Sequence, residues 1–277
     1  MTVLDDIIAG VREDMAQRKL NQPLETVQER AAQAAPALDA FDALGGNDNP
    51  RTALRVISEV KRSSPSKGAL AEIADPADLA VRYEQGGAAV ISVLTEARRF
   101  NGSLADFDAV RTAVGIPLLR KDFTVDPYQI WEARAHGADL VLLIVAALDD
   151  DQLRSFLDLT HELGMNALVE AHTAEEIQRA GAAGARIIGV NVRNLKTLDV
   201  DRSVFASLSE SIPAGAVVVA ESGVRDASDV AHYAAHGANA VLVGEALVKH
   251  DDPAATIAEF METGAAAIAD RLQASGR

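Results

Sequence analysis

The stretch Arg55-Val-Ile-Ser-Glu-Val-Lys61 joins a short aliphatic run to an acid and a lysine at its carboxyl end. Similar runs recur along the chain and end in charged or amide side chains: Pro117-Leu-Leu-Arg-Lys121, Ala167-Leu-Val-Glu170, Ile187-Ile-Gly-Val190 followed by Asn191 and Arg193, and Val217-Val-Val-Ala-Glu221. In a closed parallel barrel the carboxyl ends of all strands meet at one mouth. The pattern therefore predicts that these polar groups gather in a single cleft, an arrangement that suits catalysis rather than packing.

Aliphatic runs alternate with amphipathic stretches through most of the chain. The expected strands are residues 55–61, 89–94, 117–121, 139–145, 166–170, 186–191, 216–221 and 239–243. Phrases such as Ala135-His-Gly-Ala-Asp139 precede strands and are typical of a helix that ends at glycine. Eight strands, the helices between them and a last helix after Pro253 predict an α/β protein with a (β/α)8 TIM barrel. An open doubly wound sheet is the alternative, but the glycine-rich fingerprint that usually follows its first strand is absent.

The beginning of the chain has a helical pattern instead. Apolar residues at positions 4, 7, 8, 11 and 15 fall on one helical face, and Pro23 is suited to open a second helix. Leu44-Gly-Gly-Asn-Asp-Asn-Pro50 has the composition of a loop. We therefore expect residues 1–48 to form an N-terminal helical extension that packs on the barrel. Residues 49–277 would form the catalytic barrel, with the whole chain making one structural domain.

Composition limits the classes of function. The hydrophobic content of 48% with only 4% aromatic residues indicates an aliphatic core, which suits parallel strands covered by helices. The net charge of −15 argues against nucleic acid and anionic membrane surfaces as partners. It does not exclude a small anionic substrate, since screening over about 8 Å lets a local lysine cluster outweigh a distant acidic shell. Because cysteine is absent, disulfides, thiolate metal sites and cysteine nucleophiles are excluded.

The first residues of the chain and the length of its longest aliphatic stretch bear on localisation. The first residues lack the basic region and apolar core of a signal peptide. The longest aliphatic stretch, residues 140–148, is far shorter than the roughly 20 residues that span a bilayer. We therefore expect a cytoplasmic protein with no membrane partner.

Several of the polar residues could perform proton transfer. Glu59 and Lys61 are two residues apart and share one face of a strand. Burial can lower the pKa of a lysine and raise that of a glutamate, which suits acid–base catalysis near neutrality. Lys121 is a second candidate acid and Glu170 a candidate base. Each residue alone could be a solvated loop charge, but their joint occurrence at strand ends favours a catalytic site.

Three segments suggest a phosphate site. Arg62-Ser-Ser-Pro-Ser-Lys-Gly68 is expected to be a mobile, basic, hydroxyl-rich loop, although it is not a Walker motif. Glu221-Ser-Gly223 follows the seventh expected strand and Val243-Gly-Glu245 the eighth. In barrels of this kind the loops after these two strands often bind phosphate through backbone N–H groups. The six histidines show no metal-ligand spacing and are interpreted as structural or exposed, so neither a metal nor an organic cofactor is indicated.

Together the motifs resemble the indole-3-glycerol phosphate synthase family. The resemblance covers nearly the whole chain and is carried by Glu59-Val-Lys-Arg-Ser-Ser-Pro-Ser-Lys-Gly68, Ser92-Val-Leu-Thr-Glu96, Leu119-Arg-Lys-Asp-Phe123, Gly189-Val-Asn-Val-Arg-Asn-Leu195 and Ala220-Glu-Ser-Gly-Val224. It implies an enzyme of tryptophan biosynthesis, a carboxy-lyase that converts 1-(2-carboxyphenylamino)-1-deoxy-D-ribulose 5-phosphate to indole-3-glycerol phosphate, CO2 and water. No redox step occurs, so no cofactor is expected. Other enzymes of the pathway are the candidate protein partners.

The resemblance also implies roles for individual residues. Lys121 would be the general acid of ring closure, and Lys61 would engage the substrate carboxylate. Glu170 and Glu59 would serve proton removal and dehydration. The remaining roles are orientation of the substrate by Asn191, Arg193 and Glu221; the phosphate site at Ser64, Ser222, Gly223, Gly244 and Glu245; and a pocket for the anthranilate ring at Phe100, Phe123, Leu142, Leu195 and Val243. In this family the N-terminal extension covers the barrel mouth.

Two other functions fit a barrel with phosphate loops. Phosphoribosylanthranilate isomerases usually use a cysteine base on the first strand, where this chain has Glu59 and Lys61 instead. A non-catalytic barrel that binds a sugar phosphate or a protein would not need Glu59, Lys121 and Glu170 together. Both alternatives are therefore less well supported than the synthase.

Overall fold

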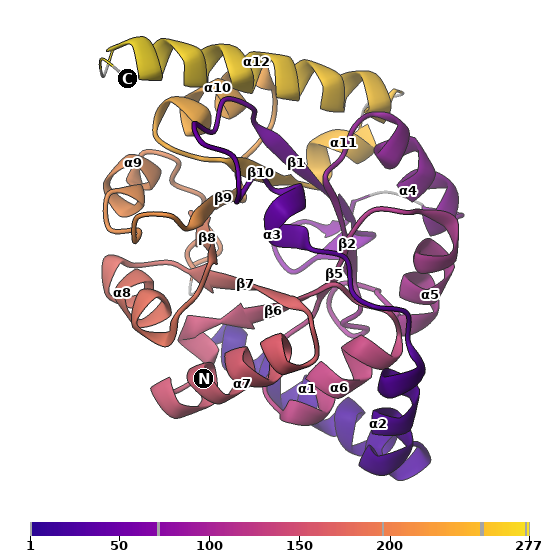
Figure 1. Ribbon diagram of the computed structural model, residues 1–277. Helices are drawn as coiled ribbons and strands as arrows, with labels where there is room; N and C mark the ends of the chain where they lie inside the picture. Colours follow the sequence, from indigo (N-terminus) through magenta and orange to yellow (C-terminus); the bar gives the residue numbers. More distant parts are fainter. Residues whose placement is uncertain (1, 71–72, 196, 250–251, 275, 277) are drawn as a thin grey trace.

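Eight parallel strands close into a barrel that is surrounded by α-helices (Figure 1). The computed structural model describes residues 2–70, 73–195, 197–249, 252–274 and 276. The barrel strands are β1 (Arg55–Val60), β4 (Val90–Leu94), β5 (Leu118–Lys121), β6 (Leu140–Ile144), β7 (Asn166–Ala171), β8 (Ile187–Asn191), β9 (Val217–Glu221) and β10 (Ala240–Val243). Each expected strand agrees with these bounds to within one residue at either end. The predicted TIM barrel is therefore confirmed.

The barrel closes between its first and its last strand. β1 pairs in parallel with β4 on one side and with β10 on the other, where Arg55 lies opposite Ala240. The other strands pair in chain order around the ring. Because all pairs are parallel and joined by crossovers, every strand ends at the same opening. We call this opening the mouth.

Helices cover the outside of the barrel. They are α4 (Pro76–Gln85), α5 (Leu104–Ala113), α6 (Pro127–Ala135), α7 (Asp150–Glu162), α8 (Ala174–Ala183), α9 (Val204–Ser209), α10 (Ala227–Ala235), α11 (Glu245–Lys249) and α12 (Pro253–Ala274), with a 3-10 turn, η1, at Val145–Ala147. Side chains of Asp75, Ser103, Asp149 and Thr173 accept hydrogen bonds from first-turn backbone N–H groups. Such caps satisfy donors that a helix leaves unpaired, which fixes where each helix begins.

The core consists of two apolar layers because side chains alternate along each strand. One layer fills the barrel with aliphatic side chains from all eight strands, among them Ile57, Leu119 and Leu168. The other layer lies between the strands and the helices and includes Val56 and Phe107. Glu59 is two residues after Ile57 and therefore faces inward, one step nearer the mouth.

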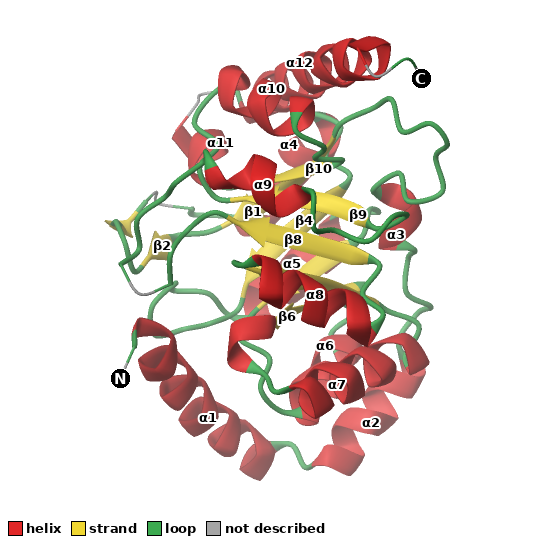
Figure 2. Cartoon of the chain, turned by 90° about the vertical axis from the view of Figure 1, so that its left-hand side faces the viewer, coloured by secondary structure: helices red, strands yellow, loops and turns green. Residues whose placement is uncertain are grey.

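The N-terminal segment runs from one end of the barrel to the other. It contains α1 (Val3–Asn21), α2 (Leu24–Gln33) and α3 (Ala40–Ala43). The first turns of α1 lie at the mouth, whereas α3 lies over the opposite opening (Figures 1 and 2). Phe41 and Leu44 join the apolar layer inside the barrel, and Asn166 accepts hydrogen bonds from the backbone N–H groups of Ala40 and Phe41 at 2.9 and 3.2 Å. The segment thus reaches the mouth as expected but also plugs the far end, which the sequence does not predict.

The loop expected after the first strand contains regular structure. Residues 63–64 (β2) and 68–69 (β3) pair as a small antiparallel hairpin, with Ser63 opposite Ala69. Arg62, at its base, forms an ion pair with Asp106 of α5. The hairpin projects from the mouth end of the barrel (Figure 2). The basic, hydroxyl-rich loop expected at residues 62–68 therefore contains a short hairpin, formed by backbone pairing that a polar Ser–Gly sequence does not signal.

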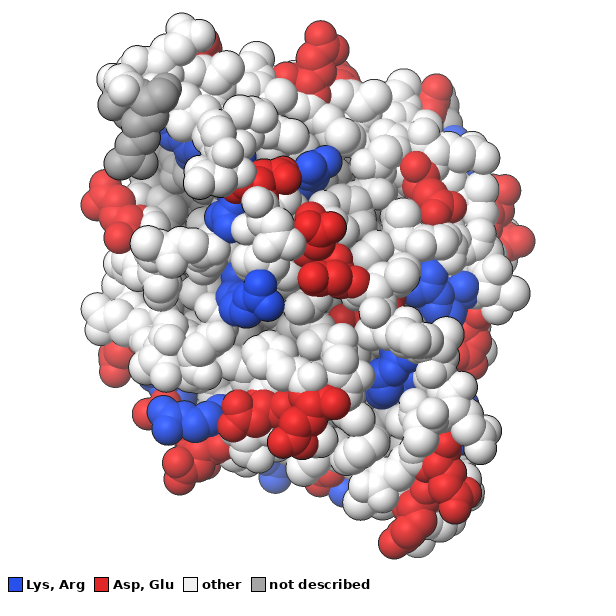
Figure 3. Space-filling model, in the orientation of Figure 1, with Lys and Arg blue, Asp and Glu red and all other residues white. Residues whose placement is uncertain are grey.

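Acidic and basic side chains are interspersed on the face at the α3 end (Figure 3). Since opposite charges lie next to each other there, this face carries no extended basic stripe among the residues drawn. Within the described ranges, no helix combines the length and apolar character that crossing a bilayer requires.

Candidate active site

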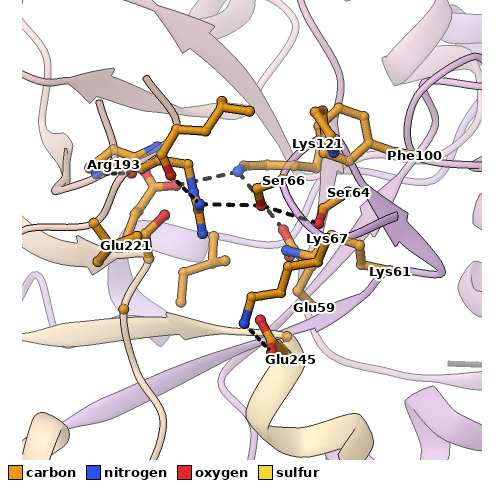
Figure 4. Close-up of a pocket in the computed structure, with 18 of the residues that line it drawn as sticks. Glu59, Lys61, Ser64, Ser66, Lys67, Phe100, Lys121, Arg193, Glu221 and Glu245 are labelled. Atoms are coloured by element: carbon orange, nitrogen blue, oxygen red, sulfur yellow. Dashed lines mark hydrogen bonds and ion pairs between the residues drawn. The ribbon is translucent and has the colours of Figure 1, made fainter. Parts of the chain in front are cut away.

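A cleft of about 620 Å³ opens at the mouth of the barrel. It is lined by every residue that the sequence predicts for the site: Glu59, Lys61, Ser64, Phe100, Lys121, Phe123, Leu142, Glu170, Asn191, Arg193, Leu195, Glu221, Ser222, Gly223, Val243, Gly244 and Glu245. Figure 4 shows ten labelled residues of this cleft, from strands and loops far apart in the sequence. The strand ends therefore bring these residues together, while their individual roles stay predictions.

Lys121 lies at the centre of three carboxyl groups. Its Nζ is 3.3 Å from Glu221 Oε2, 3.7 Å from Glu170 Oε2 and 3.8 Å from Glu59 Oε1. Burial alone would lower the pKa of Lys121, but these three carboxyl groups raise it above its usual value. Lys121 is consequently a stable ammonium at neutral pH. At Lys121 the carboxyl groups that three strands, β1, β7 and β9, bring to the ammonium therefore outweigh the effect of burial.

Glu59 departs from the expectation that burial raises the pKa of the glutamate at this position. It is almost completely buried and forms an ion pair with Lys61, which follows it by two residues, just after the end of β1. Burial raises the pKa of Glu59, but Lys61 and Lys121 outweigh burial and leave it below the usual range. Glu59 is therefore a carboxylate, not the neutral acid that burial by itself would produce.

The pKa values of Glu170 and Glu221 shift in opposite directions although both side chains are buried. Burial raises the pKa of Glu170, but His172, Lys121 and the amide of Asn191 bring it below the usual range. The Asn191 Nδ2 donates to Glu170 Oε1 at 3.0 Å. Burial and the nearby Glu170 raise the pKa of Glu221 to about 8 against the effect of Lys121. Two titratable groups whose pKa values are driven apart in one cleft are typical of an acid and a base with separate tasks.

One wall of the cleft is apolar. The rings of Phe100 and Phe123 have centroids 6.0 Å apart, and Leu142 and Leu195 lie on the same lining. The loop that carries Phe100 passes so close to β4 that a Cβ at Gly102 would lie 2.2 Å from the carbonyl oxygen of Leu94. A flat apolar slot beside charged groups can hold an aromatic ring that bears a carboxylate.

The opposite wall carries backbone turns and cations. Ser222 and Gly223 follow β9 with φ of +69° and +81°, a conformation that suits glycine and turns successive N–H groups to one side. The Glu245 carboxylate, after β10, is held by Lys67 and Lys249, each at 2.5 Å (Figure 4 shows Lys67 and Glu245). Because two ammonium groups neutralise Glu245, its side chain does not prevent an anion from binding nearby.

Other residues at the site are missed by the sequence reasoning. Arg202 and Lys249 line the cleft but lie outside the strand ends, so no strand pattern identifies them. His172, interpreted from sequence as structural or exposed, lies with Nε2 at 3.3 Å from Glu170 Oε1. The sequence does contain a signal for His172. It follows Glu170 by two residues, and in an extended chain such residues point to the same side. No cluster of His, Asp and Glu in the described part of the chain has the arrangement of a metal site.

Comparisons with known proteins agree with this geometry. The family model described as indole-3-glycerol phosphate synthase matches residues 4–260. A protein of Arthrobacter sp. (strain FB24) with that name is 72% identical, with 98% of this chain and 100% of the relative covered. The protein of the same name from Paenarthrobacter aurescens (strain TC1) is 70% identical over the same shares.

Solved structures support the fold alone. A 3-hexulose-6-phosphate synthase matches with a TM-score of 0.61 and 18% identity, over 76% of this chain and 99% of the other. Thiamine phosphate pyrophosphorylase from Pyrococcus furiosus matches with a TM-score of 0.59 and 14% identity, over 80% of this chain and 100% of the other. With the family match over nearly the full length, the conclusion is that this chain belongs to the indole-3-glycerol phosphate synthase family.

Proposed function

We propose that the protein catalyses the indole-3-glycerol phosphate synthase reaction of tryptophan biosynthesis. Its substrate is 1-(2-carboxyphenylamino)-1-deoxy-D-ribulose 5-phosphate, and its products are indole-3-glycerol phosphate, CO2 and water. The observation that carries this proposal is the Lys121 ammonium, surrounded by Glu59, Glu170 and Glu221, beside an apolar slot in a cleft lined by cations at its other wall. The arrangement supplies a proton donor and a base around one bound molecule.

The protons of the reaction can be assigned to these groups. The ring carbon that bears the carboxylate attacks the ketone carbon, and Lys121 protonates the ketone oxygen as the new carbon–carbon bond forms. The carboxylate leaves as CO2 and its electron pair restores the aromatic ring. Glu170 then takes a proton from the carbon next to nitrogen while the hydroxyl, protonated again, leaves as water. Two protons enter and one leaves, so each turnover takes up one proton from solvent.

Glu221 is suited to restore the donor. Once Lys121 has lost its proton, its amine lies among carboxyl groups that favour the ammonium. Glu221 has a pKa of about 8 and is therefore mostly protonated at neutral pH. Because its Oε2 lies 3.3 Å from Lys121 Nζ, Glu221 can return a proton without a large movement.

The remaining lining residues are assigned to binding. We assign Lys61 to the substrate carboxylate and Arg193 to the sugar hydroxyls, with Asn191 holding Glu170 in place. The aryl ring would occupy the slot formed by Phe100, Phe123, Leu142, Leu195 and Val243. The phosphate would lie at Ser64, Ser222, Gly223, Gly244 and Glu245, the last through its backbone, because its carboxylate is neutralised by Lys67 and Lys249.

The same proposal extends to organisation and setting. We infer one structural domain, in which residues 1–48 pack on the barrel of residues 49–277. This is supported by the hydrogen bonds from α3 to Asn166 and by the ion pair of Arg18 in α1 with Glu132 in α6. A cytoplasmic location and other enzymes of tryptophan biosynthesis as partners are part of the proposal.

The direct test is incubation of the purified protein with the carboxyphenylamino-deoxyribulose phosphate. We expect indole fluorescence to appear together with one equivalent of CO2, because ring closure and decarboxylation are parts of one reaction. The control is phosphoribosylanthranilate as the only substrate. If the protein isomerised phosphoribosylanthranilate but formed no indole from the carboxyphenylamino-deoxyribulose phosphate, it would be a different barrel enzyme.

Gly223 provides a test of the phosphate site. Its φ is +81°, and an added Cβ would lie 2.8 Å from the hydroxyl oxygen of Tyr233, so Gly223→Ala must displace either the backbone of this turn or the Tyr233 side chain. We expect KM to rise about tenfold, equivalent to 1.4 kcal/mol, with a smaller change in kcat, because the phosphate is remote from the reacting carbons. Steady-state kinetics measure both values.

The matched control for this variant is Gly184→Ala. Gly184 also has positive φ, +93°, but nothing lies within 4 Å of an added Cβ, and it ends α8 away from the cleft. This control carries backbone strain without touching the site. An unchanged KM in Gly223→Ala would mean that the phosphate binds elsewhere.

A further inference from the structure

A chain of three ionisable side chains leads from the cleft to the outside of the mouth. His172 follows the end of β7, and its two ring nitrogens face two different carboxylates. Nε2 lies 3.3 Å from Glu170 Oε1 and Nδ1 lies 3.2 Å from Glu176 Oε2. The side chain of His172 is only 10% exposed. An imidazole in this position can interact with both carboxylates at once only when both nitrogens carry protons.

The ring is held by the beginning of α8. Glu176 Oε2 also accepts a hydrogen bond from the backbone N–H of His172 at 2.6 Å, so one oxygen binds this residue twice. Thr173, the N-cap of α8, accepts from the backbone N–H of Glu176 at 3.1 Å. The segment Glu170-Ala-His-Thr-Ala-Glu-Glu176 therefore encodes the position of the ring locally, as a helix start placed directly after a strand.

The charges around Glu170 show why such a cation is needed. Lys121 from β5 is 3.7 Å from Glu170, but it is shared with Glu59 of β1 and Glu221 of β9. Asn191 of β8 contributes only a neutral amide hydrogen bond. On the other side, His172 faces Glu170 and Glu176, and Arg179 of α8 also acts on Glu176. Within the described ranges, His172 is thus the cation that lies beside Glu170 and beside none of the other carboxyl groups around Lys121.

We propose that His172 is a positioning residue for the synthase reaction, an imidazolium that lies between Glu170 and Glu176 and holds Glu170 in place as a carboxylate. His172 is not among the residues that line the cleft. It therefore acts through Glu170 and not on the substrate. The proposal rests on the assignment of Glu170 as the base of the proposed function. Glu176 has the complementary task of fixing the ring and balancing its charge.

The direction of the pH effect follows from these contacts. Burial lowers the pKa of His172, but Glu170 and Glu176 raise it to about 10, so the ring stays charged at neutral pH. In return His172 helps to keep the pKa of Glu170 below the usual range. Without the imidazolium, the pKa of Glu170 rises and more of the base is protonated on the acid side. The loss of activity on lowering the pH should therefore begin at a higher pH.

The test is the pH profile of kcat for His172→Gln, which keeps a polar side chain but cannot carry a charge. We expect the acid limb to move up by about one to three pH units, the usual effect of an opposite charge at this distance. At high pH the kcat should approach that of the unsubstituted enzyme, and KM should change less than twofold. A fall in kcat by one constant factor at all pH values, or an unchanged profile, would overturn the proposal.

His136→Gln is the matched control. His136 also contacts a carboxylate, with Nδ1 at 2.6 Å from Asp108 Oδ1, but it ends α6 outside the cleft. Its removal deletes a histidine–carboxylate pair of the same kind without touching Glu170. The pH profile of this variant should superimpose on that of the unsubstituted enzyme.

Nitrogen NMR of the histidine rings tests the charge without any turnover. In the full chain the His172 ring should remain doubly protonated at about pH 8, whereas an ordinary histidine titrates near 6.5. Glu176→Gln should bring the titration of His172 to lower pH. A His172 ring that titrates near 6.5 in the unsubstituted protein would refute the proposal. If instead the protein made no indole, the proposed function would fail while the NMR result stood by itself.

Discussion

Replacing Lys121 with Met is expected to lower kcat by about 10³-fold, within the range that a positioned general acid contributes. Met retains the length and the apolar stem of lysine but has no proton to donate. Lys121 Nζ lies among the carboxyl groups of Glu59, Glu170 and Glu221, and no other cation in the described part of the chain contacts all three. KM should change by less than tenfold, because the lysine acts on a charge that develops only during ring closure.

Lys121→Arg separates acid catalysis from charge. Arginine keeps the positive charge among the carboxylates but is in practice never deprotonated, so it stabilises the cluster and cannot serve as the proton donor. We expect kcat to remain near that of Lys121→Met, while thermal stability returns toward that of the unsubstituted protein. Single-turnover kinetics with saturating enzyme measure the chemical step directly. Near-normal turnover in either variant would contradict the assignment of Lys121.

Arg120→Met should lower the free energy of unfolding by about 3–5 kcal/mol, the usual cost of removing one partner from a buried ion pair. Arg120 precedes the proposed acid and is 3% exposed. Its guanidinium contacts Glu132 at 2.8 Å and Asp122 at 3.1 Å and donates to the Gln129 carbonyl oxygen at 3.1 Å. In the variant the buried carboxylates of Glu132 and Asp122 lose the positive charge of Arg120. A buried carboxylate without its ion-pair partner destabilises the folded state.

The measurement is urea denaturation of Arg120→Met and of Arg154→Met, an exposed arginine on α7. The control should change stability by no more than about 0.5 kcal/mol, as is usual for a surface position. Arg18 of α1 also contacts Glu132, at 2.8 Å, so this carboxylate keeps one cationic partner in Arg120→Met. Equal stabilities of the two variants would show that the buried pairs contribute no net stability.

The sequence predicts the barrel well because parallel strands buried on both faces are continuous aliphatic runs. Boundaries come out within one residue because a charged or amide side chain marks the end of a strand such as β5 at Lys121. The same feature identifies the lining of the cleft, since strand ends converge wherever a barrel closes. Fold and site location were therefore encoded in one pattern.

The elements that the sequence does not predict depend on contacts distant along the chain. The plug α3 has only four residues and exists because Asn166 and the barrel interior receive it. The β2–β3 hairpin carries serine, lysine and glycine with no apolar alternation. The directions of the pKa shifts of Glu59 and Lys121 depend on distances between strands, which a linear pattern does not contain. The sequence does not identify His172, because its role depends on the two carboxylates that face it.

The pairing of β1 with β10 has a consequence for biosynthesis. As the chain leaves the ribosome, one edge of β1 stays without its neighbour until residues 240–243 have been made. Unpaired strand edges are the usual starting points for wrong association, so the nascent protein must remain open for almost its entire translation. A chain that ended before that last strand would have seven strands with two exposed edges, those of β1 and β9, and the ring around the catalytic groups would not close.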